Sequence, residues 1–201
     1  MNRRAMTHTF RNGALFALML ALSACNPATP VEEPPLAGAA IGGPFTLVDK
    51  AGRTVRWDDF TGKYRIVYFG YAFCPDACPM DLGVMMRGFN AFAAKDAAAA
   101  AKVQPIFISI DPQRDTPQVV GQFTAAFSPR LIGLTGTPEQ VAGAAKAFAA
   151  YYAKGTESAG GYLMDHSRIA YLMGPKGEPI AMLPIDKGAD AVAAELAKWV
   201  R

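Results

Sequence analysis

The 201-residue sequence lacks an excess of charge of either sign. Its formal charge is +3, but three of its 20 basic residues, Arg3, Arg4 and Arg11, lie in an N-terminal segment that we expect to be removed, which leaves 17 against 17 acidic residues. A near-neutral mature chain argues against nucleic-acid binding and against a polybasic membrane-binding surface. With 51% hydrophobic residues, the chain can build one globular domain around a single core.

The sequence also lacks an apolar run long enough to serve as a transmembrane helix near its N-terminus. The run from Ala14 to Leu22 is too short for that role, follows basic residues and leads through small residues into Cys25. This pattern resembles a bacterial lipoprotein signal. We therefore predict a signal peptide over residues 1–24 and lipidation of Cys25; an ordinary secretory signal is the alternative, and either implies export.

Residues that could be buried are scarce between the predicted signal and the folded part. Residues 26–43 consist mainly of proline, alanine, glycine and glutamate, a composition typical of a flexible linker. We predict a lipidated tether over residues 25–43 and a folded domain over residues 44–201. The protein is then expected on the periplasmic side of a bacterial membrane, with the inner membrane favoured.

The remaining sequence alternates predicted strands with predicted helices. Strands are expected at residues 45–48, 53–57, 65–69, 103–110, 131–134, 168–173 and 179–183. Helices are expected at residues 78–101, 117–126, 138–151 and 190–200, the second and third capped by Thr116 and Thr137, and residues 153–161 are expected to form a loop. This order predicts a thioredoxin-like α/β fold with an N-terminal β-hairpin and a C-terminal hairpin plus helix.

Cys74 and Cys78 lie at the turn between the strand at 65–69 and the helix that follows it. The positive end of that helix should lower the pKa of a thiol there, and a thiolate is both a nucleophile and a soft-metal ligand. Dithiol redox chemistry and metal binding are therefore both open. A structural disulfide between Cys74 and Cys78 is the third interpretation, since disulfides form in exported proteins.

Topology should bring two further stretches to these cysteines. Parallel strands place their carboxyl ends at one sheet edge, and an antiparallel strand at 168–173 would begin at the same edge. Residues 74–78, 111–116 and 165–167 would then converge. His166 is the candidate imidazole ligand because His8 lies in the predicted signal, although a histidine at a strand start is often structural. For Asp115 we favour turn capping, and for Asp111 both capping and metal binding stay open.

Three blocks of sequence resemble the signature blocks of the SCO/SenC family. They are FCPDACP at residues 73–79, IDPQRDTP at residues 110–117 and YLMDHS at residues 162–167. The resemblance implies a thioredoxin-like, membrane-anchored metallochaperone, not a true enzyme, that delivers copper to the binuclear copper site of cytochrome c oxidase subunit II. The alternative is a thiol-disulfide reductase that keeps the copper-ligand cysteines of that subunit reduced.

Carried over residue by residue, the resemblance makes Cys74, Cys78 and His166 the ligands of one copper ion, with Asp111 a conditional auxiliary ligand. Cys74 and Cys78 would also form the redox disulfide. Other periplasmic copper carriers and thioredoxin-like reductants are further candidate partners. The lipid on Cys25 departs from the many relatives that use a transmembrane helix as anchor.

The donor chemistry agrees with the resemblance. Two thiolates and one imidazole suit Cu(I), and an added oxygen ligand would complete a Cu(II) site, whereas a structural zinc site usually has four protein ligands. The residues just before Cys74 provide neither the proline nor the hydroxyl that a peroxiredoxin-type peroxidase needs. The helical spacing of Met80, Met85 and Met86 predicts core positions rather than ligands, and we expect the same of Met164.

Overall fold

The computed structural model describes residues 32–157 and 161–201. The predicted signal peptide and the lipidation site Cys25 lie outside the described residues, so both remain predictions. Within the described part of the chain, no helix combines the length and the apolar character needed to cross a bilayer.

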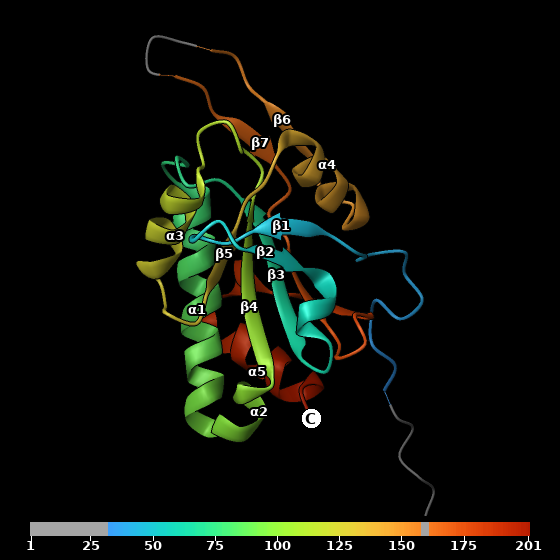
Figure 1. Ribbon diagram of the computed structural model, residues 1–201. Helices are drawn as coiled ribbons and strands as arrows, with labels where there is room; N and C mark the ends of the chain where they lie inside the picture. Colours follow the sequence, from blue (N-terminus) through green and yellow to red (C-terminus); the bar gives the residue numbers. More distant parts are fainter. Residues whose placement is uncertain (1–31, 158–160) are drawn as a thin grey trace, which may run out of the picture. The chain divides into compact units, whose positions relative to one another are not determined.

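A five-stranded sheet in the order β5-β4-β3-β8-β9 occupies the centre of the fold (Figure 1). Its strands are β3 (Tyr64–Gly70), β4 (Val103–Ser109), β5 (Ile132–Leu134), β8 (Ala170–Met173) and β9 (Pro179–Leu183). β3, β4 and β5 run parallel, whereas β8 runs antiparallel to β3, as the predicted convergence requires. β3 is buried along its whole length, which accounts for its nearly uninterrupted apolar sequence.

Helices and a hairpin cover the two faces of this sheet. The helices are α1 (Ala77–Lys95), α2 (Ala97–Ala101), α3 (Pro117–Ala125), α4 (Pro138–Ala147) and α5 (Ala189–Trp199), with short 3-10 turns η1 (Trp57–Phe60) and η2 (Ile185–Lys187). α1 and α5 pack together over one face, while α4 and η1 contribute to the core of the other. Gly88 allows the close approach of α1 and α5, because a Cβ atom there would lie 2.6 Å from Cβ of Val192.

The helix starts follow the prediction better than the helix ends. Thr116 and Thr137 cap α3 and α4 as expected, each accepting the N–H three residues later. The predicted helix to residue 101 is interrupted at Asp96, whose carboxylate accepts the Ala99 N–H at 2.8 Å and caps α2. α4 ends before the predicted residue 151 because Ala149 has a positive φ of 50°, which no α-helix accommodates.

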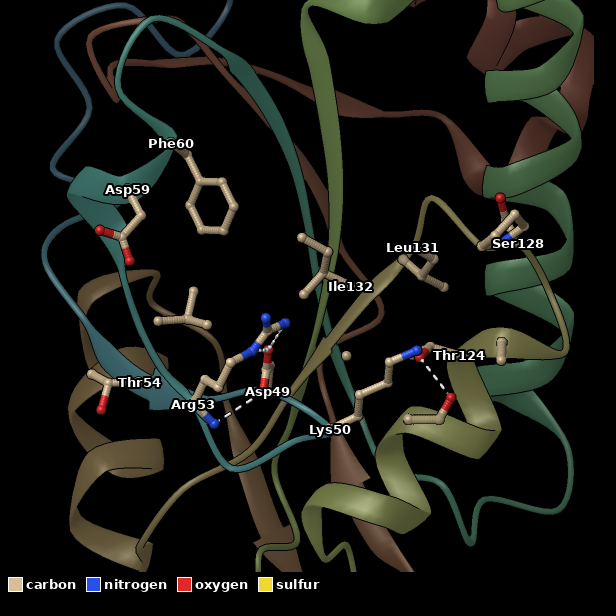
Figure 2. A pocket seen from close by; sticks show the side chains of 15 residues that line it. Asp49, Lys50, Arg53, Thr54, Asp59, Phe60, Thr124, Ser128, Leu131 and Ile132 are labelled. Atoms are coloured by element: carbon tan, nitrogen blue, oxygen red, sulfur yellow. Dashed lines mark hydrogen bonds and ion pairs between the residues drawn. The ribbon is translucent and has the colours of Figure 1, made fainter.

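The predicted N-terminal hairpin is confirmed as β1 (Thr46–Val48) paired antiparallel with β2 (Thr54–Arg56). A pocket of about 460 Å³ lies between this hairpin, α3 and β5 (Figure 2). An ion pair between Asp49 and Arg53 stands at its wall, and the apolar side chains of Phe60 and Ile132 face it. None of the predicted metal ligands lines this pocket.

The loop prediction for residues 153–161 is partly wrong. β6 (Tyr152–Lys154) pairs antiparallel with β7 (Met164–His166) in a separate two-stranded sheet. Strands of three residues are too short to produce a recognisable alternating pattern, so sequence periodicity could not reveal them. The consequence for the site is that His166 lies on a ribbon outside the central sheet.

The described part of the predicted tether lies against the domain. The Leu36 N–H donates to the Ile180 carbonyl at 3.0 Å, and the Gly42 N–H donates to the Ala147 carbonyl at 2.8 Å. Leu36 and Ile41 also pack against buried apolar residues. Residues 36–42 therefore contact the domain even though their composition is that of a linker, because their few apolar side chains pack against its core.

Candidate metal centre

The two cysteines occupy the turn from β3 into α1, as predicted. Cys74 lies in the turn and is partly exposed, whereas Cys78 is in the first turn of α1 and is fully buried. The Cys78 N–H donates to Sγ of Cys74 at 3.3 Å. Both thiols are free in this structure, and a redox disulfide between them stays a prediction.

His166, at the end of β7, completes the cluster. Its Nε2 lies 3.2 Å from Sγ of Cys78, and its Nδ1 lies 3.1 Å from the carbonyl oxygen of Ser167. Because a carbonyl can only accept, Nδ1 carries the proton and Nε2 presents its lone pair to the sulfurs. The rings of Tyr68 and Tyr71 contact the imidazole edge to face, with distances between ring centroids of 6.2 and 6.0 Å. These contacts limit rotation of the imidazole.

The three ligand atoms lie within 4.8 Å of one another. Among residues 32–157 and 161–201, no other group of cysteine, histidine or acidic side chains has such an arrangement. The predicted convergence of the cysteine turn with residues 165–167 is thus confirmed, because β8 runs antiparallel to β3 as required. Two sulfurs and one imidazole nitrogen form a donor set that favours a soft metal ion, with one ligand fewer than a structural zinc site.

The pKa prediction holds for only one of the two thiols. Burial opposes ionisation of Cys74, but N–H groups of Cys78 and Asp76 bond to its sulfur and lower its pKa overall. Burial raises the pKa of Cys78 well above its ordinary value, and the neighbouring Cys74 adds to this effect. Burial also lowers the pKa of His166, so the imidazole is neutral at pH 7 and free to accept a metal ion.

Asp111, the conditional auxiliary ligand, is engaged elsewhere. One carboxylate oxygen accepts the Tyr162 hydroxyl at 2.8 Å, and the other accepts Nε of Arg114 at 2.5 Å. The Arg114 guanidinium also stacks on the Tyr162 ring, 3.6 Å from its centroid. Asp111 therefore ties its loop to the segment before β7 and is not a member of the thiol–imidazole cluster.

An ion pair beneath the cluster was not predicted from the sequence. Asp81, one turn after Cys78 on α1, is buried and accepts both Nε and Nη2 of Arg168, at 2.8 and 2.5 Å. The Tyr68 hydroxyl donates to the same carboxylate at 2.8 Å. The one signal in the sequence is an acidic residue next to Leu82 on the face of α1 that was expected to be apolar.

Several large apolar side chains close in sequence to the ligands are exposed. Met85, Met86 and Met164 are buried as predicted, but the core prediction for Met80 is wrong, since it is 54% exposed. Five large apolar side chains in the described ranges are exposed, and four of them are close in sequence to the cluster or paired with it. We call these four the apolar rim; they are Phe73, Met80, Tyr151 and Leu163. Tyr151 is held there by its hydrogen bonds with Ser167, the residue after His166.

Comparison with known proteins identifies the family. The SCO1/SenC family model matches residues 33–201. The protein SenC of Rhodobacter capsulatus is 46% identical over 140 residues, covering 70% of this chain and 62% of that protein. The mitochondrial SCO1 homolog 1 of Arabidopsis thaliana is 38% identical over 172 residues, which cover 85% of this chain and 51% of that protein. The chain thus spans about half to three-fifths of the length of these curated relatives.

Solved structures agree with the sequence comparison. The crystal structure of Arabidopsis thaliana ScoI with copper bound has 36% identity and a TM-score of 0.73, covering 79% of this chain and 97% of that one. The structure of Bradyrhizobium japonicum ScoI with copper bound has 35% identity and a TM-score of 0.71, and the match covers 79% of this chain and 99% of that one. The thioredoxin-like fold predicted from the element order is therefore confirmed, and the chain belongs to the SCO1/SenC family.

Proposed function

We propose that this protein is a periplasmic copper metallochaperone that takes one copper ion at Cys74, Cys78 and His166 and passes it to cytochrome c oxidase subunit II. The observation that carries the proposal is the cluster itself, in which three soft donor atoms lie within 4.8 Å of one another. Copper is the cargo here rather than a resident cofactor. Relatives with copper bound and 35–36% identity support the choice of metal.

The geometry of the cluster suits a cargo that must leave again. Cu(I) is stable with two or three soft ligands, so the three protein donors bind it without enclosing it. Cys74 is partly exposed, which gives an incoming ligand access to the ion, while the fully buried Cys78 holds it from the interior side. Binding displaces the thiol protons, so copper uptake should release protons.

Transfer to a protein partner is supported by the apolar rim. Large apolar side chains exposed near a functional site are candidates for contact with a protein partner. Phe73 and Met80 flank the cysteine pair in sequence, and Leu163 lies three residues before His166. A protein docked on the apolar rim would therefore have its own ligands close to the bound ion.

The membrane anchor is proposed on the sequence pattern alone. Lipidation of Cys25 would attach the chain to the periplasmic side of a membrane, with the inner membrane favoured because the proposed oxidase partner is located there. Leu36 bonds to the domain, so a spacer between the lipid and this contact would comprise about ten residues, which span at most about 35 Å when fully extended.

The asymmetry of the two thiols favours a second candidate function, thiol-disulfide reduction of cysteines in the oxidase subunit. A reductase needs one accessible thiol to attack a disulfide and a second to resolve the mixed disulfide. Cys74 is partly exposed and Cys78 is buried next to it, which matches these two roles. In this function His166 should be nearly dispensable.

An anaerobic copper titration of the reduced, purified protein separates the two functions. The parent should bind one Cu(I) per chain and, with Cu(II), show sulfur-to-copper charge-transfer absorption. His166→Ala and Cys78→Ser should both lose the Cu(II) absorption, while Met182→Ala, an exposed residue of β9, should behave like the parent. Weak copper binding by the parent, together with rapid turnover of a disulfide-bonded peptide, would instead establish the reductase.

A further inference from the structure

His166 lies on a ribbon that is separate from the central sheet, whereas Cys74 and Cys78 lie at the turn from β3 into α1. His166 ends β7, which among the strands of the described residues pairs with β6 alone and not with the central sheet. A two-stranded ribbon with three residues in each strand is only marginally stable by itself. Contacts outside the ribbon must therefore help to place the imidazole relative to the cysteines; Tyr68 and Tyr71 limit its rotation, and a contact with α1 would fix the segment that carries it.

The Arg168–Asp81 ion pair makes such a contact. Arg168 follows His166 by two residues, and Asp81 follows Cys78 by three residues on α1. The guanidinium meets the carboxylate through both Nε and Nη2, which fixes direction as well as distance. Asp81 is only 4% exposed, and Tyr68 donates to the same carboxylate from β3, so the anchor point on α1 cannot swing.

We propose that the Arg168–Asp81 ion pair is a positioning clamp, which holds the strand bearing His166 against the helix bearing Cys78 and so places the imidazole over the two sulfurs. Neither residue belongs to the ligand cluster. The inference rests on the proposed copper site and adds the residues that set its geometry. The hydrogen bond from Nδ1 of His166 to the Ser167 carbonyl orients the imidazole ring. The clamp fixes the position of the backbone segment that carries this ring.

The clamp should matter more for one copper valence than for the other. Cu(I) can be held by the two thiolates alone, whereas Cu(II) prefers a tetragonal site and needs the imidazole nitrogen. A variant without the clamp should therefore lose affinity for Cu(II) and keep most of its affinity for Cu(I). General damage to the fold would weaken the binding of both ions.

Electrostatics alone predicts a different pattern. Asp81 and Arg168 carry opposite charges, so removing one or the other would change the potential at the sulfurs in opposite directions. Loss of a positioning clamp should instead lower the affinity for Cu(II) in both variants. Comparing Asp81→Asn with Arg168→Ala therefore separates the two explanations, and Asp81→Asn keeps the volume of the side chain and an acceptor for Tyr68.

The test is a competition titration of the purified protein with Cu(I) and with Cu(II). Asp81→Asn and Arg168→Ala should each weaken Cu(II) binding by about 10- to 100-fold, with Cu(I) binding nearly unchanged. Arg168→Lys, which keeps the charge but not the bidentate contact, should lie between them and the parent. Arg53→Ala removes another Arg–Asp pair, in the turn of the β1–β2 hairpin, and serves as the matched control.

A double variant closes the test. If the clamp acts through His166, His166→Ala/Arg168→Ala should bind Cu(II) no more weakly than His166→Ala alone. Additive losses, opposite effects of the two single variants, or unchanged Cu(II) binding would each overturn the clamp while the copper site itself stands. A parent that binds no copper would overturn the proposed function, and the clamp with it.

Discussion

Asp115 holds the turn that carries Cys74 through a hydrogen bond to a backbone group 43 residues away. Its Oδ2 accepts the Ala72 N–H at 2.9 Å and the Ser109 hydroxyl at 2.6 Å, and the side chain is fully buried. Its second oxygen, Oδ1, is buried without a hydrogen-bond partner. Burial raises the pKa of Asp115 above its ordinary value of 3.8.

This raised pKa predicts a pH-dependent contribution to stability. Between pH 3.8 and the raised pKa of Asp115, the folded protein binds more protons at this site than the unfolded chain does. The contribution of Asp115 is therefore full below pH 3.8 and falls as the pH rises through the folded-state pKa. Urea unfolding of the parent and of Asp115→Asn should show the stability difference shifting in favour of the variant as the pH rises. A constant difference would contradict the assignment.

The close approach of α1 and α5 predicts a strong effect of one added methyl group. A Cβ atom at Gly88 would lie 2.6 Å from Cβ of Val192 and 2.7 Å from the Ala189 carbonyl oxygen. Gly88→Ala should destabilise the protein by about 1–3 kcal/mol, because the two helices must move apart. Gly143→Ala on α4, where nothing lies within 4 Å, should instead be neutral or stabilising by up to about 1 kcal/mol. Thermal unfolding of both variants gives the comparison.

The buried guanidinium of Arg65 predicts that lysine is no substitute. Arg65 is 1% exposed, donates from Nη1 to the Gly174 carbonyl at 2.8 Å and lies 4.4 Å from the Trp57 ring centroid. A lysine ammonium would lose the stacking and remain buried and poorly paired, so Arg65→Lys should cost about 1–3 kcal/mol. The exposed Arg53→Lys is the matched control. Equal denaturation midpoints for the two variants would show that the buried contact contributes little.

Local patterns were enough to predict the cysteine side of the site. A buried strand, a turn with two cysteines and an amphipathic helix place Cys74 and Cys78 by short-range rules alone. The expected topology then predicted that His166 lies near the cysteines. Parallel crossovers are right-handed, and the strand that follows His166, β8, runs antiparallel to β3. The four-residue offset between the cysteines and the one histidine outside the predicted signal peptide were visible in the sequence without any knowledge of the fold.

Long-range partners could not be predicted in the same way. A buried carboxylate such as Asp81 requires a cation or several donors, yet nothing in the sequence selects Arg168, 87 residues away, over the other basic residues. Met80 is exposed because it lies two residues before Leu82, on the face of α1 opposite the buried Leu82 and Met85, so its spacing in fact indicated exposure. The engagement of Asp111 by Tyr162 likewise depends on a contact between distant segments.

The apolar rim predicts a separation between copper binding and copper transfer. Leu163 and Met80 are 57% and 54% exposed and do not belong to the ligand cluster, so Leu163→Ser and Met80→Gln should leave the copper affinity unchanged. If a partner docks on the rim, each variant should slow transfer by about fivefold or more, the effect of losing one strong interface contact. The measurement is stopped-flow transfer from the Cu(I)-loaded protein to the soluble copper domain of an oxidase subunit II.

Two controls complete the transfer experiment. Met182→Gln changes an exposed methionine on β9, which is not part of the apolar rim, and should transfer at the parental rate. Transfer to a small-molecule chelator should be equally fast for all variants, because a chelator needs no docking surface. Slower transfer to the chelator would mean that Met80 or Leu163 affects release of the ion itself. Parental rates to the oxidase domain would place the docking surface elsewhere on the molecule.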